Sequence, residues 1–155
     1  MEITFGSLQA LILINMALQG NLKIGGKTYG IVECEYEFVQ TVDETGKPTS
    51  RTMGGQITFV MPATSDDDLF FYRWMMSKTE VKSGIFRFRI YSHENKISYK
   101  SVEFMNAYCV RLRDFFNDHD SKLMYTTITI SAEAIRVGSL DSVVHFNEWG
   151  GSYGG

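Results

Sequence analysis

Cysteine is scarce in this sequence, which contains only Cys34 and Cys109. Each of the two lies within an alternating apolar stretch, where a reduced thiol packs as a small apolar side chain. A disulfide between them stays open as an alternative, but two thiols in one core are more often reduced. We therefore expect both thiols to be buried and reduced.

An apolar run long enough to cross a membrane is also lacking, since a spanning helix needs about eighteen residues or more. The nearest stretch is LQALILINMAL at residues 8–18, which is too short for a span. It also lacks the basic segment that begins a signal peptide. We expect no membrane insertion, and a protein that is made and folded in the cytoplasm.

A strong charge of one sign is missing as well, because 15 Lys and Arg residues face 18 Asp and Glu residues, for a net charge of -3. No overall basic field would gather nucleic acid or anionic lipid, so we expect protein partners and no nucleic acid. Arginines on strands near aromatic residues can bind a nucleic acid strand. Strands expose charges to solvent in general, however, and glutamates 33, 35 and 37 offer these arginines partners. The arginines are Arg87, Arg89, Arg111 and Arg113.

The residues that usually carry catalysis or bind metals form no convincing pattern. His93 and His119 lie in turn sequences, and His145 has no second histidine nearby, which is typical of a surface or interface residue. Asp118, His119 and Asp120 offer metal ligands, but adjacent residues of a turn rarely converge on one ion. We expect no catalytic residue, no metal and no cofactor, and thus a protein that is not an enzyme.

What the sequence does contain is the alternation of apolar and polar residues that half-buried strands show. The pattern predicts a strand over residues 29–40, with glutamates on one face, and a shorter strand near residues 18–24 that turns at Gly25 and Gly26. Further strands are predicted over residues 55–61, 84–91 and 97–116, and the last, over residues 123–137, should be the longest. The fold class is mainly β, a small antiparallel barrel or sandwich of about seven strands with one short α-helix and a long extended loop.

The one helix is predicted over residues 65–76. Ser65 is a suitable N-cap, and the aspartates at residues 66–68 would favour the positive end of the helix dipole. Calcium binding by these aspartates is the weaker reading, because the pattern of a calcium loop is missing. The helix is apolar nearly all round, so it should be covered on more than one side.

Two polar segments remain to be explained. The strand over residues 123–137 has one apolar face and one face of hydroxyl and acidic side chains, which would suit a wetted wall. The loop at residues 41–55 is far longer than a hairpin turn, and loops of this length often have a function of their own. The polar face holds Thr127, Thr129, Ser131 and Glu133. The loop holds Asp43, Glu44, Gly46, Lys47, Pro48, Ser50, Arg51, Gly54 and Gly55.

The order of several motifs is similar to that of a known family. The run GGKTYGIVECEYEFVQTVDETGKPTSRTMGGQITF is followed by WM, SGIFRF, KSVEFMNAYCV, TTITISAEAIRVG and NEW. Over residues 17–149 the chain resembles the tube protein of type VI secretion systems, the haemolysin-coregulated protein (Hcp, TssD) family, in its Bacteroidetes branch.

This resemblance implies a small β-barrel that closes into a homohexameric ring, and rings that stack into a hollow tube. A contractile sheath on a baseplate would propel the tube, capped by the spike protein VgrG, and the lumen can hold effector proteins. The subunit would then be cytoplasmic at first and later secreted. The loop would be an arm that packs on a neighbouring subunit or the next ring, where its backbone groups find partners, and the hydroxyl face would line the lumen.

The resemblance also suggests boundaries and leaves alternatives. Residues 16–149 would form the single barrel domain, with residues 1–15 as an extension outside the fold and residues 150–155 as a flexible tail. Met1 and Met16 are both candidates for the start. A tail-tube protein of a phage or of an extracellular contractile particle shares the expected architecture, and a ligand-binding β-sandwich module is an alternative from another class.

Overall fold

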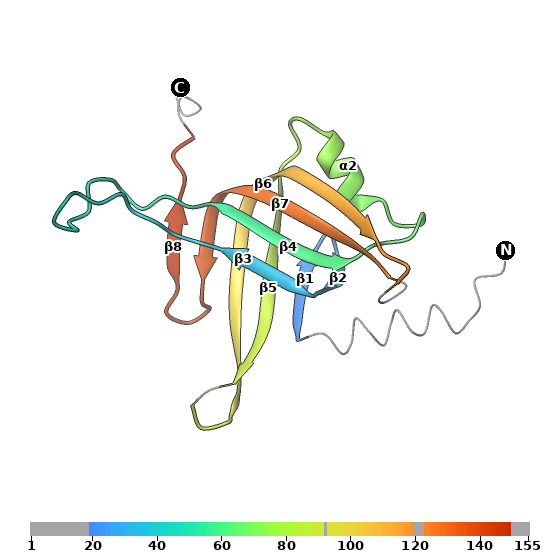
Figure 1. The fold of residues 1–155 in the computed structure, drawn as a ribbon, viewed down its shortest axis with the longest axis horizontal. Helices are drawn as coiled ribbons and strands as arrows, with labels where there is room; N and C mark the ends of the chain where they lie inside the picture. Colours follow the sequence, from blue (N-terminus) through green and yellow to red (C-terminus); the bar gives the residue numbers. More distant parts are fainter. Residues whose placement is uncertain (1–18, 92, 120–122, 150–155) are drawn as a thin grey trace.

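The computed structural model of the chain describes residues 19–91, 93–119 and 123–149. These residues form one eight-stranded antiparallel sheet that curls into a half-barrel, with a short helix beside it (Figure 1). The mainly β class and the single short helix are thereby confirmed for the described part of the chain. The expected extension and tail lie outside the described residues.

The sheet has the strand order β2-β1-β5-β6-β7-β4-β3, and β8 pairs with β7 beside it. The first five elements are β1 (Gly20–Ile24), β2 (Lys27–Ile31), β3 (Glu33–Tyr36), β4 (Gln56–Pro62) and α2 (Phe70–Met76). The others are β5 (Lys82–Tyr91), β6 (Ile97–Phe116), β7 (Met124–Val137) and β8 (Val143–Phe146).

The core lies inside the curl, where the apolar faces of the strands pack together and Phe71 of α2 contacts Tyr29 of β2 and Phe59 of β4. Phe59 of β4 packs edge-on against Phe86 of β5 at 5.1 Å between ring centres, and Phe86 also contacts Phe104 of β6 at 5.6 Å. Phe71 and Trp74 of α2 are fully buried, and each such side chain contributes about 2 kcal/mol of apolar burial. The alternation of the strands therefore decides which face closes on the helix.

The turn between β1 and β2 confirms the predicted hairpin. Gly25 and Gly26 both have positive φ angles, 59° and 76°, which glycine adopts without strain. A β-carbon at Gly25 would lie 2.6 Å from the ring of Phe70, so the turn also packs closely against α2.

The predicted strand over residues 29–40 is wrong in its continuity. It is two strands, because the chain changes partner at Val32: β2 pairs with β1 at one end of the sheet and β3 with β4 at the other. Val32 donates its backbone N–H to Val60, 2.8 Å away, and thereby joins the corner to β4. The alternation continues across the corner, so the sequence alone conceals the break.

The helix begins at Phe70 with Leu69 at its N-cap, not at Ser65 as predicted. Residues 64–68 form a turn in which Asp68 donates its N–H to the Ser65 carbonyl oxygen at 3.0 Å. The Asp68 carboxylate instead accepts hydrogen bonds from the Tyr29 hydroxyl at 2.8 Å and the Phe70 N–H at 3.2 Å. Asp68 thus joins the start of the helix to β2, and Ser65 lies in the turn before the helix.

The longest strand is β6 with 20 residues, not β7 with 14. β6 bends without ending, because Asn106 has a positive φ of 50° and the register shifts between Cys109 and Arg111. Both thiols are free, as expected, but only Cys109 is buried. Cys34 is half-buried, since it lies on a strand at the end of the sheet.

Candidate assembly surface

Residues 37–55, called the arm below, connect β3 to β4 and extend well beyond the sheet (Figure 1). The arm is a narrow ribbon whose two sides pair with each other. Val39 and Met53 exchange backbone hydrogen bonds of 2.9 and 2.7 Å, and Val42 forms a bridge with Pro48 nearer the tip. These backbone groups therefore find their partners within the arm, which corrects the expectation that a neighbouring subunit supplies them.

The tip of the arm is fixed by one carboxylate. Asp43 accepts hydrogen bonds from the Thr45 hydroxyl at 2.7 Å, the Thr45 N–H at 2.8 Å and the Lys47 N–H at 3.0 Å. These bonds hold the pKa of Asp43 below its usual value, the bond from the Thr45 side chain being the largest cause. Gly46 supplies the positive φ, 84°, that the turn requires.

An ion pair and hydrogen bonds hold the base of the arm against β7 and the segment after β8. Arg51 lies 2.7 Å from the Glu148 carboxylate, and this contact lowers the pKa of Glu148. The Asn147 amide donates to the Ala132 carbonyl oxygen at 2.9 Å, and the Ala132 N–H donates to Gly55 at 2.7 Å. The charge of Arg51 is thus paired within the chain.

Most of the predicted arm residues are gathered at the exposed tip. Ser50 and Gly54 are partly covered and Gly55 is buried at the base. The arm also exposes apolar side chains, which the reading of the sequence as a polar loop had overlooked. They are Phe38 (39% exposed), Val39 (47%), Val42 (59%) and Met53 (43%).

The predicted hydroxyl face lies on the outward side of β7, opposite the core. Thr127, Thr129, Ser131 and Glu133 are all half-buried, while the residues between them are buried. Thr129 shares a hydrogen bond of 2.9 Å with Thr58 of β4, and Glu133 accepts one of 3.0 Å from Asn106. Ser131 borders a hollow beside Met53 and Gly54, so this face meets the arm at its base.

Charged residues border the hydroxyl face on both sides. We call Glu33 and Glu35 of β3 the acidic rail, and Arg111 and Arg113 of β6 the basic rail. Cross-strand neighbours share a face. Two rows of cross-strand neighbours therefore run over the hydroxyl face from β3 to β6. They are Glu35–Thr58–Thr129–Arg111 and Glu33–Val60–Thr127–Arg113. β7 and β4 separate the rails, so the expected pairing of these glutamates with these arginines does not occur within the described chain.

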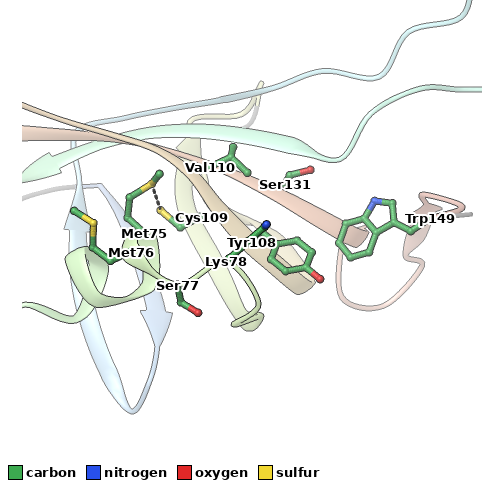
Figure 2. A pocket seen from close by; sticks show the side chains of 9 residues that line it. All are labelled: Met75, Met76, Ser77, Lys78, Tyr108, Cys109, Val110, Ser131 and Trp149. Atoms are coloured by element: carbon green, nitrogen blue, oxygen red, sulfur yellow. Dashed lines mark hydrogen bonds between the residues drawn. The ribbon is translucent and has the colours of Figure 1, made fainter. Parts of the chain in front are cut away.

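A groove of about 710 Å³ lies between the C-terminal end of α2 and Trp149 (Figure 2). Tyr108 and Trp149 pack at 5.3 Å between ring centres on one side of it. On the other side, Cys109 lies 3.7 Å from the Met75 sulfur. The remaining lining residues are Met76, Ser77, Lys78, Val110 and Ser131.

The described residues contain no group of three His, Cys, Asp or Glu side chains arranged to hold a metal ion. His145 lies at the arm's base, where its ring packs 5.4 Å from Phe38 and its Nε2 lies 3.1 Å from the Asn147 oxygen. Asn147 and Glu148 support the arm, although nothing in the sequence indicates them as its partners. Some ninety residues separate them from the arm, so no short stretch of sequence shows that they contact it.

The curled antiparallel sheet, the short helix and the projecting arm define the class of Hcp tube proteins. Hcp1 from Flavobacterium johnsoniae has 26% sequence identity and a TM-score of 0.69, covering 84% of this chain and 100% of its own. Hcp1 of E. coli EAEC 042, in a mutant form, has 15% identity and a TM-score of 0.66, covering 84% of this chain and 99% of its own.

The family model of the hemolysin coregulated protein Hcp (TssD) matches residues 16–150, so the chain belongs to this family of type VI secretion tube-type proteins. The suspected family is thereby confirmed. A comparison with curated proteins found no match. In the described ranges, no helix has the length and apolar character that crossing a membrane requires.

Proposed function

We propose that the chain is the repeating subunit of a type VI secretion inner tube, which assembles as homohexameric rings that stack. The observation that carries this proposal is the arm. The two sides of the arm pair with each other, so the arm keeps its shape without a partner. It nevertheless exposes the apolar side chains of Phe38, Val39, Val42 and Met53. Apolar side chains on such a projection are explained by burial against a second copy.

The hydroxyl face supports a role as the tube's inner wall. Thr127, Thr129 and Ser131 give a surface of small polar groups that stays wet and does not bind apolar segments tightly. Effector proteins would pass along or rest in this lumen. A spike protein, a contractile sheath and a baseplate complete the apparatus that would export the tube, and the role of the chain is structural rather than catalytic.

Electron microscopy and sedimentation of the purified chain test the proposal. We expect rings with an open centre for the parent. In a shortened variant, Asn-Gly replaces residues 41–51, so that the Val39–Met53 pairing continues into a two-residue turn. This variant should keep its strand content by circular dichroism, because loop closure changes little, but should form weaker rings or stacks.

A control leaves the arm intact and changes one exposed charge in the turn between β5 and β6, Lys96→Ala. This variant should assemble like the parent. A parent chain that stays monomeric at all concentrations would contradict the proposed function. Unaltered rings and stacks in the shortened variant would contradict the role of the arm only.

A further inference from the structure

The hairpin of β5 and β6 extends beyond the other strands and exposes apolar side chains where it projects (Figure 1). We call residues 87–91 and 97–100 the hairpin end. Proteins rarely gather large exposed apolar side chains in one place without a binding partner. Those exposed in the hairpin end are Ile90, Tyr91, Ile97 and Tyr99.

The hairpin end is basic, although the whole chain is acidic. It contains Arg87, Arg89 and Lys100 but no acidic residue, whereas the net charge of the chain is -3. In the turn that follows β5, Glu94 pairs with Lys96 at 3.0 Å, so these two charges cancel. Among the described residues, neither guanidinium group of the hairpin end has an ion-pair partner. The overall charge thus hides a local positive surface that suits an anionic partner.

The guanidinium groups and the aromatic rings share one face of the hairpin. Tyr91 lies opposite Ile97 and Arg89 opposite Tyr99, and cross-strand neighbours project from the same face. The Arg87 guanidinium lies over the Tyr99 ring, 4.0 Å from its centre, and that of Arg89 lies 5.9 Å from the ring centre of Tyr91. These contacts hold both cations beside the rings.

Polarity changes along this face as it changes across the interface of a lipid bilayer. Tyr91 and Ile97 lie farthest out, and Arg89 precedes Tyr91 by two residues, which is about 7 Å of strand. Interfacial segments bury their apolar groups about 5–10 Å into the boundary between headgroups and acyl chains. With Tyr91 at this boundary, the guanidinium groups would reach the lipid phosphates. Tyrosine suits the position, because its ring is apolar and its hydroxyl is polar.

The opposite end of β6 lacks this combination of charge and apolar surface. Phe115 and Phe116 are exposed there as well, but Asp114 and the exposed Asp118 accompany them. An anionic surface would repel these carboxylates. Charge complementarity therefore favours the hairpin end as the part of β6 that meets acidic lipid.

Arginine beside tyrosine also suits a strand of nucleic acid, whose bases stack on aromatic rings. The aliphatic side chains decide between the two partners. Ile90 and Ile97 offer no stacking surface to a base, whereas both can enter the apolar part of a bilayer.

We propose that the hairpin end binds the surface of a bilayer that contains anionic lipids, with Tyr91 and Ile97 at the acyl boundary and Arg87 and Arg89 on the phosphates. The chain lies on such a membrane and does not span it. This inference goes beyond the proposed function and does not depend on it, because one copy carries the whole hairpin end.

Flotation of the full chain with lipid vesicles tests the proposal. The chain should float with vesicles of equal parts phosphatidylglycerol and phosphatidylcholine, but not with phosphatidylcholine alone. Arg87→Gln with Arg89→Gln should weaken the partition at least about tenfold, since each basic residue near an anionic surface contributes a factor of about five. Arg87→Gln alone changes only an exposed side chain and should weaken it about fivefold.

The apolar groups are tested by Tyr91→Ser with Ile97→Ser, which should also weaken the partition at least about tenfold. Matched controls alter the same kinds of group elsewhere. Phe116→Ser with Met124→Ser changes a cross-strand pair at the opposite end of β6, where the exposed fractions are 62% and 39% compared with 66% and 52% in the hairpin end.

A control for charge is Arg73→Gln with Lys78→Gln, which removes two exposed cations in and just after α2. Both control variants should partition like the parent.

The depth of the hairpin end separates insertion from adsorption by charge alone. Tyr91→Trp places an indole at its outermost position. With anionic vesicles, the added fluorescence should shift to the blue and be quenched by brominated acyl chains. Phe116→Trp should show neither effect.

Circular dichroism confirms that each variant is folded, and Arg87→Gln decides the role of charge if the double variant is not. A parent that does not float with anionic vesicles, or hairpin variants that float as well as the parent, would overturn the proposal. Tighter binding to a single-stranded oligonucleotide than to these vesicles, lost in the same variants, would assign the hairpin end to nucleic acid and overturn it too. A chain that forms rings but does not float would overturn this inference only.

Discussion

At the scale of single residues, the residue type predicts some local features, such as turns, but not the partners that tertiary structure brings close. Gly25 and Gly26 indicated their turn correctly, because glycine adopts positive φ freely. The helix start was misplaced at Ser65, because Asp68 binds both the Tyr29 hydroxyl, 39 residues away, and the N–H of Phe70, where the helix begins. A residue's type limits the bonds it can make, but the fold decides which partner comes within reach.

Gly55 illustrates how a distant contact fixes a residue. Its φ is 109°, and a β-carbon there would overlap the amide of Asn147. Gly55→Ala should therefore cost more than the roughly 1–3 kcal/mol of backbone strain alone, measured by urea unfolding. Gly46→Ala, at φ 84° with no atom within 4 Å of the added carbon, should cost only about 1–2 kcal/mol. Equal losses would contradict the clash.

The thiols give a prediction about pH. Burial raises the pKa of Cys109 from 9.0 to about 11, and that of Cys34 to about 12, with Glu35 as a second cause. The folded chain therefore holds these protons more tightly, so this contribution to stability is complete below pH 9 and is lost as the pH rises toward 11–12. Alkylation at pH 8 should be much slower in the folded chain than in urea.

The double change Cys34→Ala and Cys109→Ala should cost about 1–3 kcal/mol of unfolding free energy through lost packing and leave assembly intact. It should also flatten the loss of stability between pH 9 and 11 relative to the parent. A disulfide detected by mass spectrometry in freshly isolated protein would contradict this account.

At the scale of elements, the period of two predicted most strands and the sides that they bury. β7 alternates as expected, because one face packs on the core throughout. The corner at Val32 and the length of β6 were not predictable, since partner exchange and bending leave the alternation unchanged. The presence of a long loop could be predicted from its composition. The pairing of its two sides and the ion pair between Arg51 and Glu148 could not, because they depend on the tertiary structure.

A small polar network joins α2 to the sheet. The Tyr72 hydroxyl donates to Asp114 of β6 at 2.6 Å, and the buried Thr126 hydroxyl of β7 donates to the same carboxylate at 2.5 Å. Asp114→Ala leaves the Thr126 hydroxyl without this acceptor and should cost about 1–3 kcal/mol. Tyr72→Phe keeps the Thr126 bond and should cost about 1 kcal/mol.

A double-mutant cycle on Tyr72 and Asp114 measures their coupling. If the two losses simply add, the network does not hold the helix on the sheet. Helix content by circular dichroism should stay constant in all variants, so that any change reports on the contact between the elements.

At the scale of the whole molecule, the family could be identified from the order of its motifs, whereas the distribution of charge over the surface could not. Composition showed a nearly balanced charge, yet the fold places carboxylates at one sheet edge and guanidinium groups at the other. Such separation depends on strand order, which no short stretch of sequence records.

Salt gives the last prediction, because it weakens attraction between exposed charges but has little effect on a buried core. The Debye length falls from about 10 Å at 0.1 M to about 3 Å at 1 M salt. If the rails hold copies together, rings should dissociate at higher protein concentration in 1 M sodium chloride than in 0.1 M, while the urea midpoint of the folded chain changes little. A chain with both rails exchanged, Glu33→Arg and Glu35→Arg with Arg111→Glu and Arg113→Glu, should assemble with the same dependence on salt. Rings that are equally stable at both salt concentrations would show that apolar and backbone contacts suffice and that the rails do not contribute.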